Sequence, residues 1–387
     1  MFASRTNWNL AENRLAQALA EHRRSGRLLL DLTLSNPTDA GFAYNSSAIL
    51  SALQNTASLH YEPTSQGLLS AREAVAHYYS EKGIHISPAD LFLTTSTSEA
   101  YSWLFRLLCN PGDEVLIPAP SYPLFDFLAD ISDVKLVRYP LLYDYGWQID
   151  FASFEKAITP RARAAIVVHP NNPTGQYAKP REQAQLSAIC TQQGLALIAD
   201  EVFLDFSIER SSANSFVAQT NALAFALGGI SKLCGLPQMK SAWIALSGPQ
   251  KLKNGARQRL EVIADSYLSM NAPVQHALPA FLATRSQFES QLLLRVRANL
   301  VFLDQEIAKQ RTCSRLVFDA GWNVVLRVPA TRSDEDLTLG LLERHGVLVH
   351  PGHFYDFSHD GFLVLSLIVA EREFAEGVQS LLAFFSC

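Results

Sequence analysis

Three polar segments whose residue types are suited to chemistry each follow a short apolar run. They are His169-Pro-Asn-Asn-Pro-Thr-Gly175, Ala199-Asp-Glu-Val-Phe203 and Gly228-Gly-Ile-Ser-Lys232-Leu-Cys-Gly-Leu-Pro237. A carboxylate favours a nearby positive charge, and a lysine that has lost its proton is a nucleophile. Taken singly, each segment has an ordinary interpretation as a turn, a helix cap or a surface loop. Their shared position after apolar runs favours one common ligand site instead.

The apolar runs predict the strands of an α/β domain. Seven candidate strands cover residues 91–94, 115–117, 134–139, 164–168, 195–200, 222–227 and 243–246. Helical patterns separate several of them, such as residues 181–193 after the start signal Pro180. This alternation predicts a mainly parallel central sheet that is covered by helices on both faces. The carboxyl ends of such strands form the ligand crevice, so the three polar segments should converge there.

The pattern changes toward the end of the chain and predicts a smaller α+β unit. A charged helical stretch covers residues 281–311, and a final helix starts near residue 371. Short strands are expected at residues 324–328, 346–349 and 363–367. The helix expected at residues 10–24 and the strand at 28–33 would pack with this unit. We therefore expect a large domain at residues 45–280 and a small domain formed by residues 1–44 and 281–387.

Composition and charge exclude several classes of protein. The chain has 387 residues, of which 48% are hydrophobic and 18% charged, which excludes disorder as the main state. The net charge of −5, with no basic cluster beyond His22-Arg23-Arg24, argues against a nucleic-acid partner. No apolar stretch could span a membrane, and the first residues lack a secretory apolar core. Five cysteines, the last being Cys387, show no metal-ligand spacing. We expect a cytoplasmic protein without a metal or a membrane partner.

Further segments complete a family pattern. They are Ser35-Asn-Pro-Thr38, Tyr61-x-Pro-x-x-x-Gly67 with Arg72, Thr94-Thr-Ser-Thr-Ser-Glu-Ala100 and Pro118-Ala-Pro-Ser-Tyr-Pro-Leu-Phe125. With them, the chain from Asp31 to Ser366 resembles the fold type I pyridoxal-phosphate enzymes of the class I/II aminotransferase family. Asn-Asn-Pro-Thr-Gly with Asp-Glu-Val and Ser-Lys downstream is specific for this family, and far less specific for any one substrate. The resemblance implies pyridoxal 5'-phosphate as the cofactor.

The resemblance assigns roles around the cofactor ring. Lys232 corresponds to the family's lysine, which forms a Schiff base with the cofactor aldehyde and then moves the substrate's α-proton. Asp200 corresponds to the carboxylate whose charge favours the protonated ring nitrogen. Tyr122 corresponds to the aromatic residue that stacks on the ring, and Asn172 to the amide at the ring 3-oxygen. Lys232 and Asp200 are therefore the expected catalytic residues.

The cofactor phosphate needs backbone N–H donors, preferably at the start of a helix. Ser96, Thr97 and Ser98 precede a helical pattern at residues 100–108 and fit this need, although they would also fit a simple helix cap. Tyr61 corresponds to a tyrosine that reaches the phosphate of the neighbouring subunit in this family. The resemblance therefore implies a homodimer with shared active sites.

Three cofactor-side positions depart from the family pattern. Phe203 stands where the family usually has a tyrosine, so one hydroxyl contact to the ring 3-oxygen is missing. Gly229 replaces a serine three residues before the lysine. Lys240 replaces an arginine and supplies charge to the phosphate without the paired hydrogen bonds of a guanidinium. Phe203 and Lys240 remain expected cofactor contacts.

A fourth departure concerns the substrate. In Phe362-Leu-Val364-Leu-Ser366, Val364 replaces the family's arginine, which binds the α-carboxylate of an amino acid. A carboxylate entering a water-poor site needs a cation or several donors. Either another basic residue such as Arg5 substitutes, or the substrate lacks a carboxylate there. We expect weak activity toward aspartate and alanine, and better activity toward a bulkier or amine-type donor.

The sequence thus predicts an aminotransferase that moves an amino group between an amino donor and a keto acid, with both substrates left open. A lyase that performs β-elimination or related chemistry at Cα would use the same cofactor residues and is the leading alternative. A non-catalytic regulatory module is the weaker alternative, because only about 30 residues precede Asp31, whereas such regulators usually carry a DNA-binding helix-turn-helix there.

Overall fold

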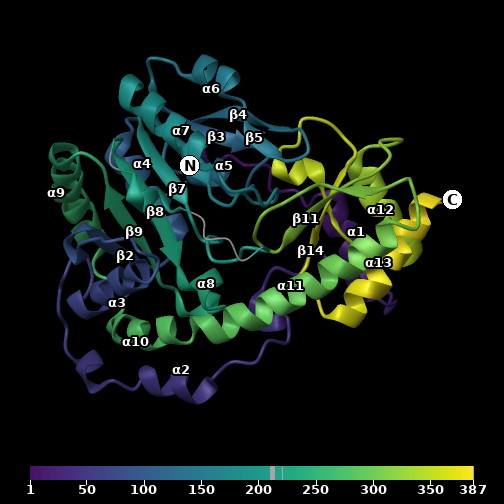
Figure 1. The fold of residues 1–387 in the computed structure, drawn as a ribbon, viewed down its shortest axis with the longest axis horizontal. Coiled ribbons are helices and arrows are strands. Elements are labelled where there is room, and N and C mark those ends of the chain that lie inside the picture. Colours follow the sequence, from purple (N-terminus) through teal and green to yellow (C-terminus); the bar gives the residue numbers. More distant parts are fainter. Residues whose placement is uncertain (210–213, 220, 387) are drawn as a thin grey trace.

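The computed structural model describes residues 1–209, 214–219 and 221–386, so Cys387 lies outside the described residues. Eight strands form one sheet in the order β2-β9-β8-β7-β6-β3-β4-β5 (Figure 1). Their bounds are β2 Leu91–Thr94, β3 Glu114–Ala119, β4 Lys135–Tyr143, β5 Trp147–Ile149, β6 Ala162–Val168, β7 Ala196–Asp200, β8 Ala224–Gly229 and β9 Ala242–Ser247. Strands β8, β7, β6, β3 and β4 are parallel, whereas β9 and β5 are antiparallel to their neighbours. The prediction of a mainly parallel sheet is confirmed.

Helices cover both faces of this sheet because its strands bury alternate side chains on opposite sides. In β6, Ala164, Ile166 and Val168 belong to one apolar cluster, and Ala165 and Val167 to the other. The first cluster includes helices α4 (Thr97–Leu108), α5 (Phe125–Asp130) and α9 (Gln250–Tyr267). The second includes α2 (Ser46–Ala52), α3 (Leu69–Ser80), α6 (Phe151–Ala157), α7 (Pro180–Gln193) and α10 (Ala272–Ala283). The sheet is therefore buried on both faces, as its composition predicts.

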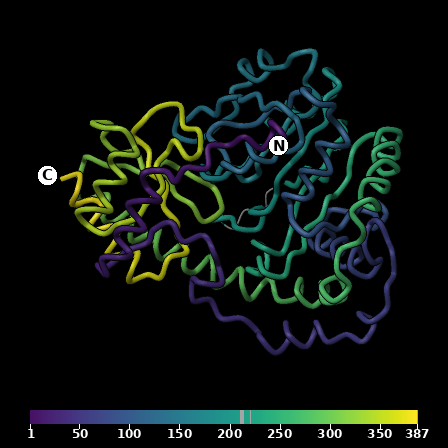
Figure 2. The backbone as a smooth tube through the Cα atoms, turned by 180° about the vertical axis from the view of Figure 1, so that it is seen from behind, coloured from purple at the N-terminus to yellow at the C-terminus, as the bar shows by residue number. Residues whose placement is uncertain are grey.

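A second sheet forms from the carboxyl-terminal part of the chain. Its order is β10-β11-β14-β13, all antiparallel, with the bounds β10 Ser314–Arg315, β11 Asn323–Arg327, β13 His350–Pro351 and β14 Phe362–Ser366. Beside it, β1 (Leu30–Asp31) pairs in parallel with β12 (Val347–Leu348). The helices of this unit are α1 (Arg14–Arg24), α11 (Arg285–Ile307), α12 (Asp334–His345) and α13 (Glu371–Ser386). Figure 2 shows the purple N-terminal segment beside the green and yellow elements, and Leu15 of α1 packs on Leu339 of α12. The N-terminal segment packs here, as expected.

The helix predicted at residues 281–311 is wrong in its bounds. The structure has two helices there, α10 and α11, which meet at Thr284. Thr284 keeps nearly helical angles (φ −84°, ψ −9°). No glycine or proline stands at this position or directly beside it, so the sequence does not indicate the break. No helix in the described part of the chain is long and apolar enough to cross a bilayer. The division into domains near residues 45 and 280 stays a prediction, and residue 280 lies inside α10.

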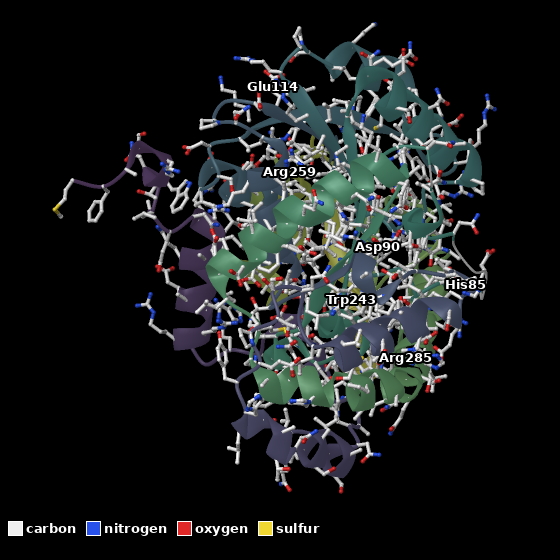
Figure 3. All side chains as sticks on the ribbon, turned by 90° about the vertical axis from the view of Figure 1, so that its left-hand side faces the viewer. His85, Asp90, Glu114, Trp243, Arg259 and Arg285 are labelled. Carbon is white, nitrogen blue, oxygen red and sulfur yellow. The ribbon has the colours of Figure 1, made fainter. Side chains whose placement is uncertain are left out.

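The packing of Trp243 fixes the end of β8 just before Lys232. Trp243 lies in the interior of the molecule (Figure 3), where it is 1% exposed and its indole N–H donates to the Tyr79 hydroxyl over 3.1 Å. Gly228 is its direct cross-strand partner. A Cβ atom on Gly228 would lie 2.6 Å from Trp243 Cε2. The indole therefore occupies the space that any side chain at position 228 would need.

We expect Gly228→Ala to lower the free energy of unfolding by about 1–3 kcal/mol, because the added methyl group must displace a buried indole. Urea denaturation of the purified variant measures this change. Gly255→Ala on α9 is the control, since a Cβ there meets only the Arg259 side chain, at 3.3 Å. That control should be neutral or stabilising by up to about 1 kcal/mol. A Gly228→Ala variant as stable as the unmodified protein would contradict the packing argument.

Candidate active site

A cavity of about 380 Å³, here called the central pocket, lies between the large sheet and the second sheet. The ends of β7 and β8 and the first residues of α4 line it from one side, and β11, β13 and β14 line it from the other. Its volume is in the range of small-molecule sites. Eight of the ten predicted site residues line it, namely Ser96, Thr97, Ser98, Tyr122, Asn172, Asp200, Phe203 and Lys232.

Strand register brings the three polar segments together. Val168 at the end of β6 is the direct partner of Asp200 at the end of β7. Lys232 lies on α8 (Ile230–Leu233), which begins where β8 ends at Gly229. Because β6, β7 and β8 are parallel neighbours, their carboxyl ends share one edge of the sheet. The predicted convergence of Asn172, Asp200 and Lys232 at one pocket is confirmed.

Hydrogen bonds offset only part of the cost of burying the Asp200 carboxylate. The Tyr101 hydroxyl donates to its Oδ2 over 3.0 Å, and the Val202 N–H donates to its Oδ1 over 3.2 Å. Burial raises its pKa to about 6, although both hydrogen bonds and the charge of Lys232 oppose that rise. The carboxylate is therefore ionised at pH 7, yet it would gain from a further cationic donor in the pocket.

Lys232 is an amine held in apolar surroundings. Burial lowers its pKa to about 8, and the negative charge of Asp200 partly opposes this change. Its Nζ lies 4.9 Å from the ring centre of Trp322 and 5.8 Å from that of Phe203. A substantial fraction of the side chain is therefore neutral near pH 8, which is the form that attacks a carbonyl carbon.

The start of α4 can bind an anion. Ser96 is the N-cap residue, and its Oγ accepts from the Glu99 N–H over 3.1 Å. Glu99 Oε2 in turn accepts from the N–H and the hydroxyl of Thr95, the residue before the cap, over 2.6 and 2.9 Å. The first N–H groups of a helix have no partner within it, so those of Thr97 and Ser98 remain for a ligand at the pocket wall. The cap prediction and the anion-site prediction are thus compatible.

Two further predicted residues face the pocket with defined orientations. The Asn323 side chain donates through Nδ2 to Asn172 Oδ1 over 2.8 Å, which leaves Asn172 Nδ2 as a donor. Tyr122 is 42% exposed, and its ring lies edge-on to Phe125 at 6.1 Å. An exposed ring at a pocket wall has a free face on which another ring can stack.

Three residues considered from the sequence lie outside the pocket lining. Tyr61 is 67% exposed and lies beside a smaller hollow that Met270 also lines. Lys240 is exposed and follows a short turn in the left-handed conformation (φ 52°). Arg5 forms an ion pair with Asp133 near the end of α5. The roles of Tyr61 and Lys240 stay predictions, and Arg5 is not among the residues that line the pocket.

Several lining residues were missed in the sequence. Tyr101 holds Asp200 from the second turn of α4, and Trp322 covers Lys232. His350 and Tyr355 also line the pocket and are joined by a hydrogen bond of 3.0 Å between Nδ1 and the hydroxyl. The signal that could have identified Trp322 is its place two residues before the strand predicted at residues 324–328. His350 carried a similar signal, because it directly follows the strand predicted at residues 346–349. Tyr101 carried none, because its role depends on a contact with the distant Asp200.

Packing explains one of the departures from the family pattern. A Cβ atom on Gly229 would lie 3.0 Å from Ala242 Cβ and 3.2 Å from the Ser241 carbonyl oxygen. Such contacts are tighter than ordinary van der Waals contact, so a serine would require the neighbouring strand β9 to shift. Gly229 therefore suits the close approach of β9 in this chain.

Comparison with known proteins decides the family. A family model described as aminotransferase class I and II matches residues 29–381. The chain belongs to this family. Its cofactor is therefore pyridoxal 5'-phosphate, as the sequence predicted.

Curated relatives carry aminotransferase names. The glutamate-pyruvate aminotransferase AlaA of Escherichia coli K12 is 29% identical over 255 residues, which are 65% of this chain and 63% of that protein. In this match the chain therefore spans less than two thirds of the relative's length. The glutamate-pyruvate aminotransferase AlaA of Haemophilus influenzae is 27% identical over 373 residues, which are 93% of this chain and 91% of that protein.

Solved structures show the same fold over the whole chain. The alanine aminotransferase from Pyrococcus furiosus has a TM-score of 0.90 at 21% identity and covers 100% of both chains. A single mutant of the Thermus thermophilus aspartate aminotransferase has a TM-score of 0.86 at 20% identity and covers 99% of both. The predicted fold class is confirmed.

We expect Lys232 of the cofactor-free protein to react with an aldehyde increasingly as the pH rises through about 8, because only the neutral amine attacks. Brief exposure to pyridoxal phosphate, borohydride reduction and peptide mapping measure the labelled fraction. In Asp200→Asn the curve should move to lower pH, since the charge that raises the pKa of Lys232 is gone. A midpoint near the ordinary lysine value of 10.5, or identical curves for the two proteins, would contradict the assignment.

Proposed function

We propose that this protein is a pyridoxal-phosphate-dependent aminotransferase that transfers an amino group from an amino donor to a keto acid. The observation that carries the proposal is the placement of Asp200, Lys232 and the start of α4 around one pocket. A buried carboxylate, an amine of lowered pKa and a helix N-terminus match a protonated ring nitrogen, an aldehyde and a phosphate, respectively.

The residues present fit the cofactor at each of its polar groups. Asp200 would accept from the ring N–H, and the N–H groups of Thr97 and Ser98 would bind the phosphate. The free face of Tyr122 would cover the ring. Asn172 Nδ2, which Asn323 leaves free, would donate to the ring 3-oxygen. Phe203 offers no hydroxyl there, so Asn172 is the donor that this chain retains.

The side chains then divide the chemistry between them. When bound, the cofactor withdraws electrons from the donor's Cα and makes a hydrogen on that carbon acidic. Lys232 Nζ is suited to accept this proton, because its pKa of about 8 keeps part of it neutral at physiological pH. Trp322 and Phe203 flank Nζ and limit the access of water to it. Tyr101 and Val202 hold the Asp200 carboxylate in place by their hydrogen bonds.

The proposal includes a homodimer with shared active sites and a cytoplasmic location. Tyr61, the residue assigned to the neighbouring subunit's phosphate, is largely exposed in the single chain. Leu59, two residues earlier, is 92% exposed, so both side chains are accessible for the subunit contact that the proposal requires. The names of the relatives suggest pyruvate as an acceptor to test. The cytoplasmic location rests on the sequence composition.

We expect Asp200→Ala to lower kcat by at least about 10²-fold, because losing a charge aimed at a developing charge typically costs several kcal/mol. The cofactor should remain attached to Lys232, and its absorbance after borohydride reduction checks this. Tyr101→Phe is the graded comparison, since it removes one hydrogen bond and keeps the carboxylate, and it should cost about tenfold or less. Near-normal turnover of Asp200→Ala would contradict the role of the carboxylate.

An aminotransferase and a lyase can be distinguished by the product that receives the donor's nitrogen. The purified enzyme is incubated with a panel of amino donors, with and without pyruvate. An aminotransferase forms alanine in proportion to the donor consumed and releases no ammonia. Lys232→Ala, which lacks the amine, is the control for background. Stoichiometric ammonia release that needs no keto acid would contradict transamination and establish the lyase.

A further inference from the structure

One hydrogen bond joins the second sheet to a predicted cofactor residue. Asn323, the first residue of β11, donates through Nδ2 to Asn172 Oδ1 over 2.8 Å. Asn172 lies in the turn after β6 of the large sheet, so this bond links the two sides of the central pocket. Among the described residues, neither side chain has a second hydrogen-bond partner. An amide has an acceptor on one side and a donor on the other, so the bond determines which of them Asn172 turns away from Asn323.

The backbone before β11 is docked on the turn that carries Asn172. The N–H groups of Asp319 and Ala320 both donate to the Gly175 carbonyl oxygen, over 3.0 and 2.9 Å. In return, Asp319 Oδ2 accepts from the Tyr177 N–H over 3.0 Å. The first two contacts use main-chain atoms alone. They therefore persist when a side chain of β11 is changed, and they hold the start of that strand in place.

Gly175 permits this close approach. It has a positive φ of 70°, and a Cβ atom there would lie 2.7 Å from the Ala320 carbonyl oxygen and 2.8 Å from Phe318 Cβ. Any side chain at this position would push the docked backbone away. The glycine of the Asn-Asn-Pro-Thr-Gly segment thus keeps the start of β11, and with it Asn323, within reach of Asn172.

The orientation of Asn172 matters because Phe203 offers no hydroxyl to the ring 3-oxygen of the cofactor. In the proposed function, Asn172 is the donor that remains at that oxygen. Asn323 occupies Oδ1, so Nδ2 is the atom left to donate. If the amide were turned over, its oxygen would face the ring 3-oxygen, and two acceptors in contact repel each other.

We propose that Asn323 is a positioning residue, which orients the Asn172 amide so that its N–H group donates to the ring 3-oxygen of the bound cofactor. This inference rests on the place of Asn172 in the proposed function and adds the residue that controls it. A hydrogen bond to a charged oxygen stabilises the negative charge there. The orientation of Asn172 therefore affects how strongly the adjacent nitrogen, which joins Lys232 to the cofactor, holds its proton.

The test is a pH titration of the visible absorbance of the holoenzyme without substrate, because this absorbance reports the loss of that proton. Asn323→Leu keeps the size of the side chain and removes its donor. We expect the midpoint to rise by at least about 0.5 pH unit, since a 3-oxygen without its donor holds the neighbouring proton more strongly. An unchanged or lower midpoint would overturn the proposal. Asn323→Ala should shift the midpoint in the same direction and decides the matter if Asn323→Leu does not fold.

A double-mutant cycle shows whether Asn323 acts through Asn172. Asn172→Ala should raise the midpoint at least as much as Asn323→Leu does, and the double variant should show no further rise. Two shifts that add would mean that Asn323 acts independently of Asn172, which overturns the positioning role.

Val325→Ala is the matched control on the same strand. Val325 is 3% exposed and lies two residues along β11, so its loss loosens the packing of the strand without removing the bond to Asn172. Its stability should fall while its midpoint stays that of the unmodified protein. A midpoint shift as large as that of Asn323→Leu would assign the effect to strand packing and overturn the proposal.

The charges around the cofactor are the same in all these variants. They retain every titratable residue of the described pocket lining, namely Tyr101, Tyr122, Asp200, Lys232, His350 and Tyr355. A difference in midpoint between variants therefore reflects the two uncharged amides.

The same data separate this inference from the proposed function. A rise in Asn172→Ala without one in Asn323→Leu overturns the role of Asn323 and leaves that of Asn172 standing. No rise in Asn172→Ala overturns the placement of Asn172 at the 3-oxygen, and the inference falls with it. If the midpoint rises in both variants, yet no donor of the panel yields alanine from pyruvate, the positioning role holds and the aminotransferase is overturned.

Discussion

Asp200 carries a negative charge at the end of a strand that is buried on both faces, and burial alone would neutralise it. Two hydrogen bonds and the nearby Lys232 hold its pKa at about 6, so the carboxylate remains ionised at neutral pH. The same burial lowers the pKa of Lys232 to about 8. Both shifts cost folded-state stability in the cofactor-free protein. The free energy of unfolding falls as the pH rises from 3.8, the ordinary pKa of an aspartate, to about 6, because the buried Asp200 must lose its proton. It also falls as the pH drops from 10.5, the ordinary pKa of a lysine, to about 8, because the buried Lys232 must take up a proton. Between pH 6 and 8 the empty pocket is therefore at its least favourable, and a ligand with a cationic nitrogen would relieve that cost.

The surrounding fold is arranged so that this pair can exist. Parallel neighbours β7 and β8 place Asp200 and Lys232 at one edge, which no antiparallel pairing of the two strands would do. Helix α4 acts on the site at two points, because its start faces the pocket and its Tyr101 donates to Asp200. A shift of α4 would move the anion site and the hydrogen bond to the carboxylate together. The tight contact of Gly228 with Trp243 likewise couples the position of α8 to the core beneath it.

The sequence predicted the parts of this arrangement that depend on local patterns. The ends of β6, β7 and β8 were marked by apolar runs followed by polar segments, and parallel pairing then required those segments to meet. Where the signal was not local, prediction failed. Strand β5 has three residues and no apolar run of its own, and the break between α10 and α11 has no helix-ending residue. Tyr101 acts through its hydrogen bond to Asp200, a distant residue, so only the folded chain shows this pair. His350 acts through Tyr355, which is close to it in the sequence.

Val364 matters for a different reason, because it stands where the family has an arginine that binds a carboxylate. The sequence showed that an arginine was absent, but it did not show whether another cation replaced it. Strand pairing places Val325 and His350 directly beside Val364, and burial disfavours the charged form of His350, so neither direct neighbour replaces the arginine. The pocket thus has one charged wall and one uncharged wall. On the charged wall, Asp200 and Lys232 fit the cofactor's ring nitrogen and aldehyde. Among the described residues of the lining, none on the uncharged wall supplies a permanent positive charge, so a substrate carboxylate that lies there needs several hydrogen-bond donors or a cation from outside this lining.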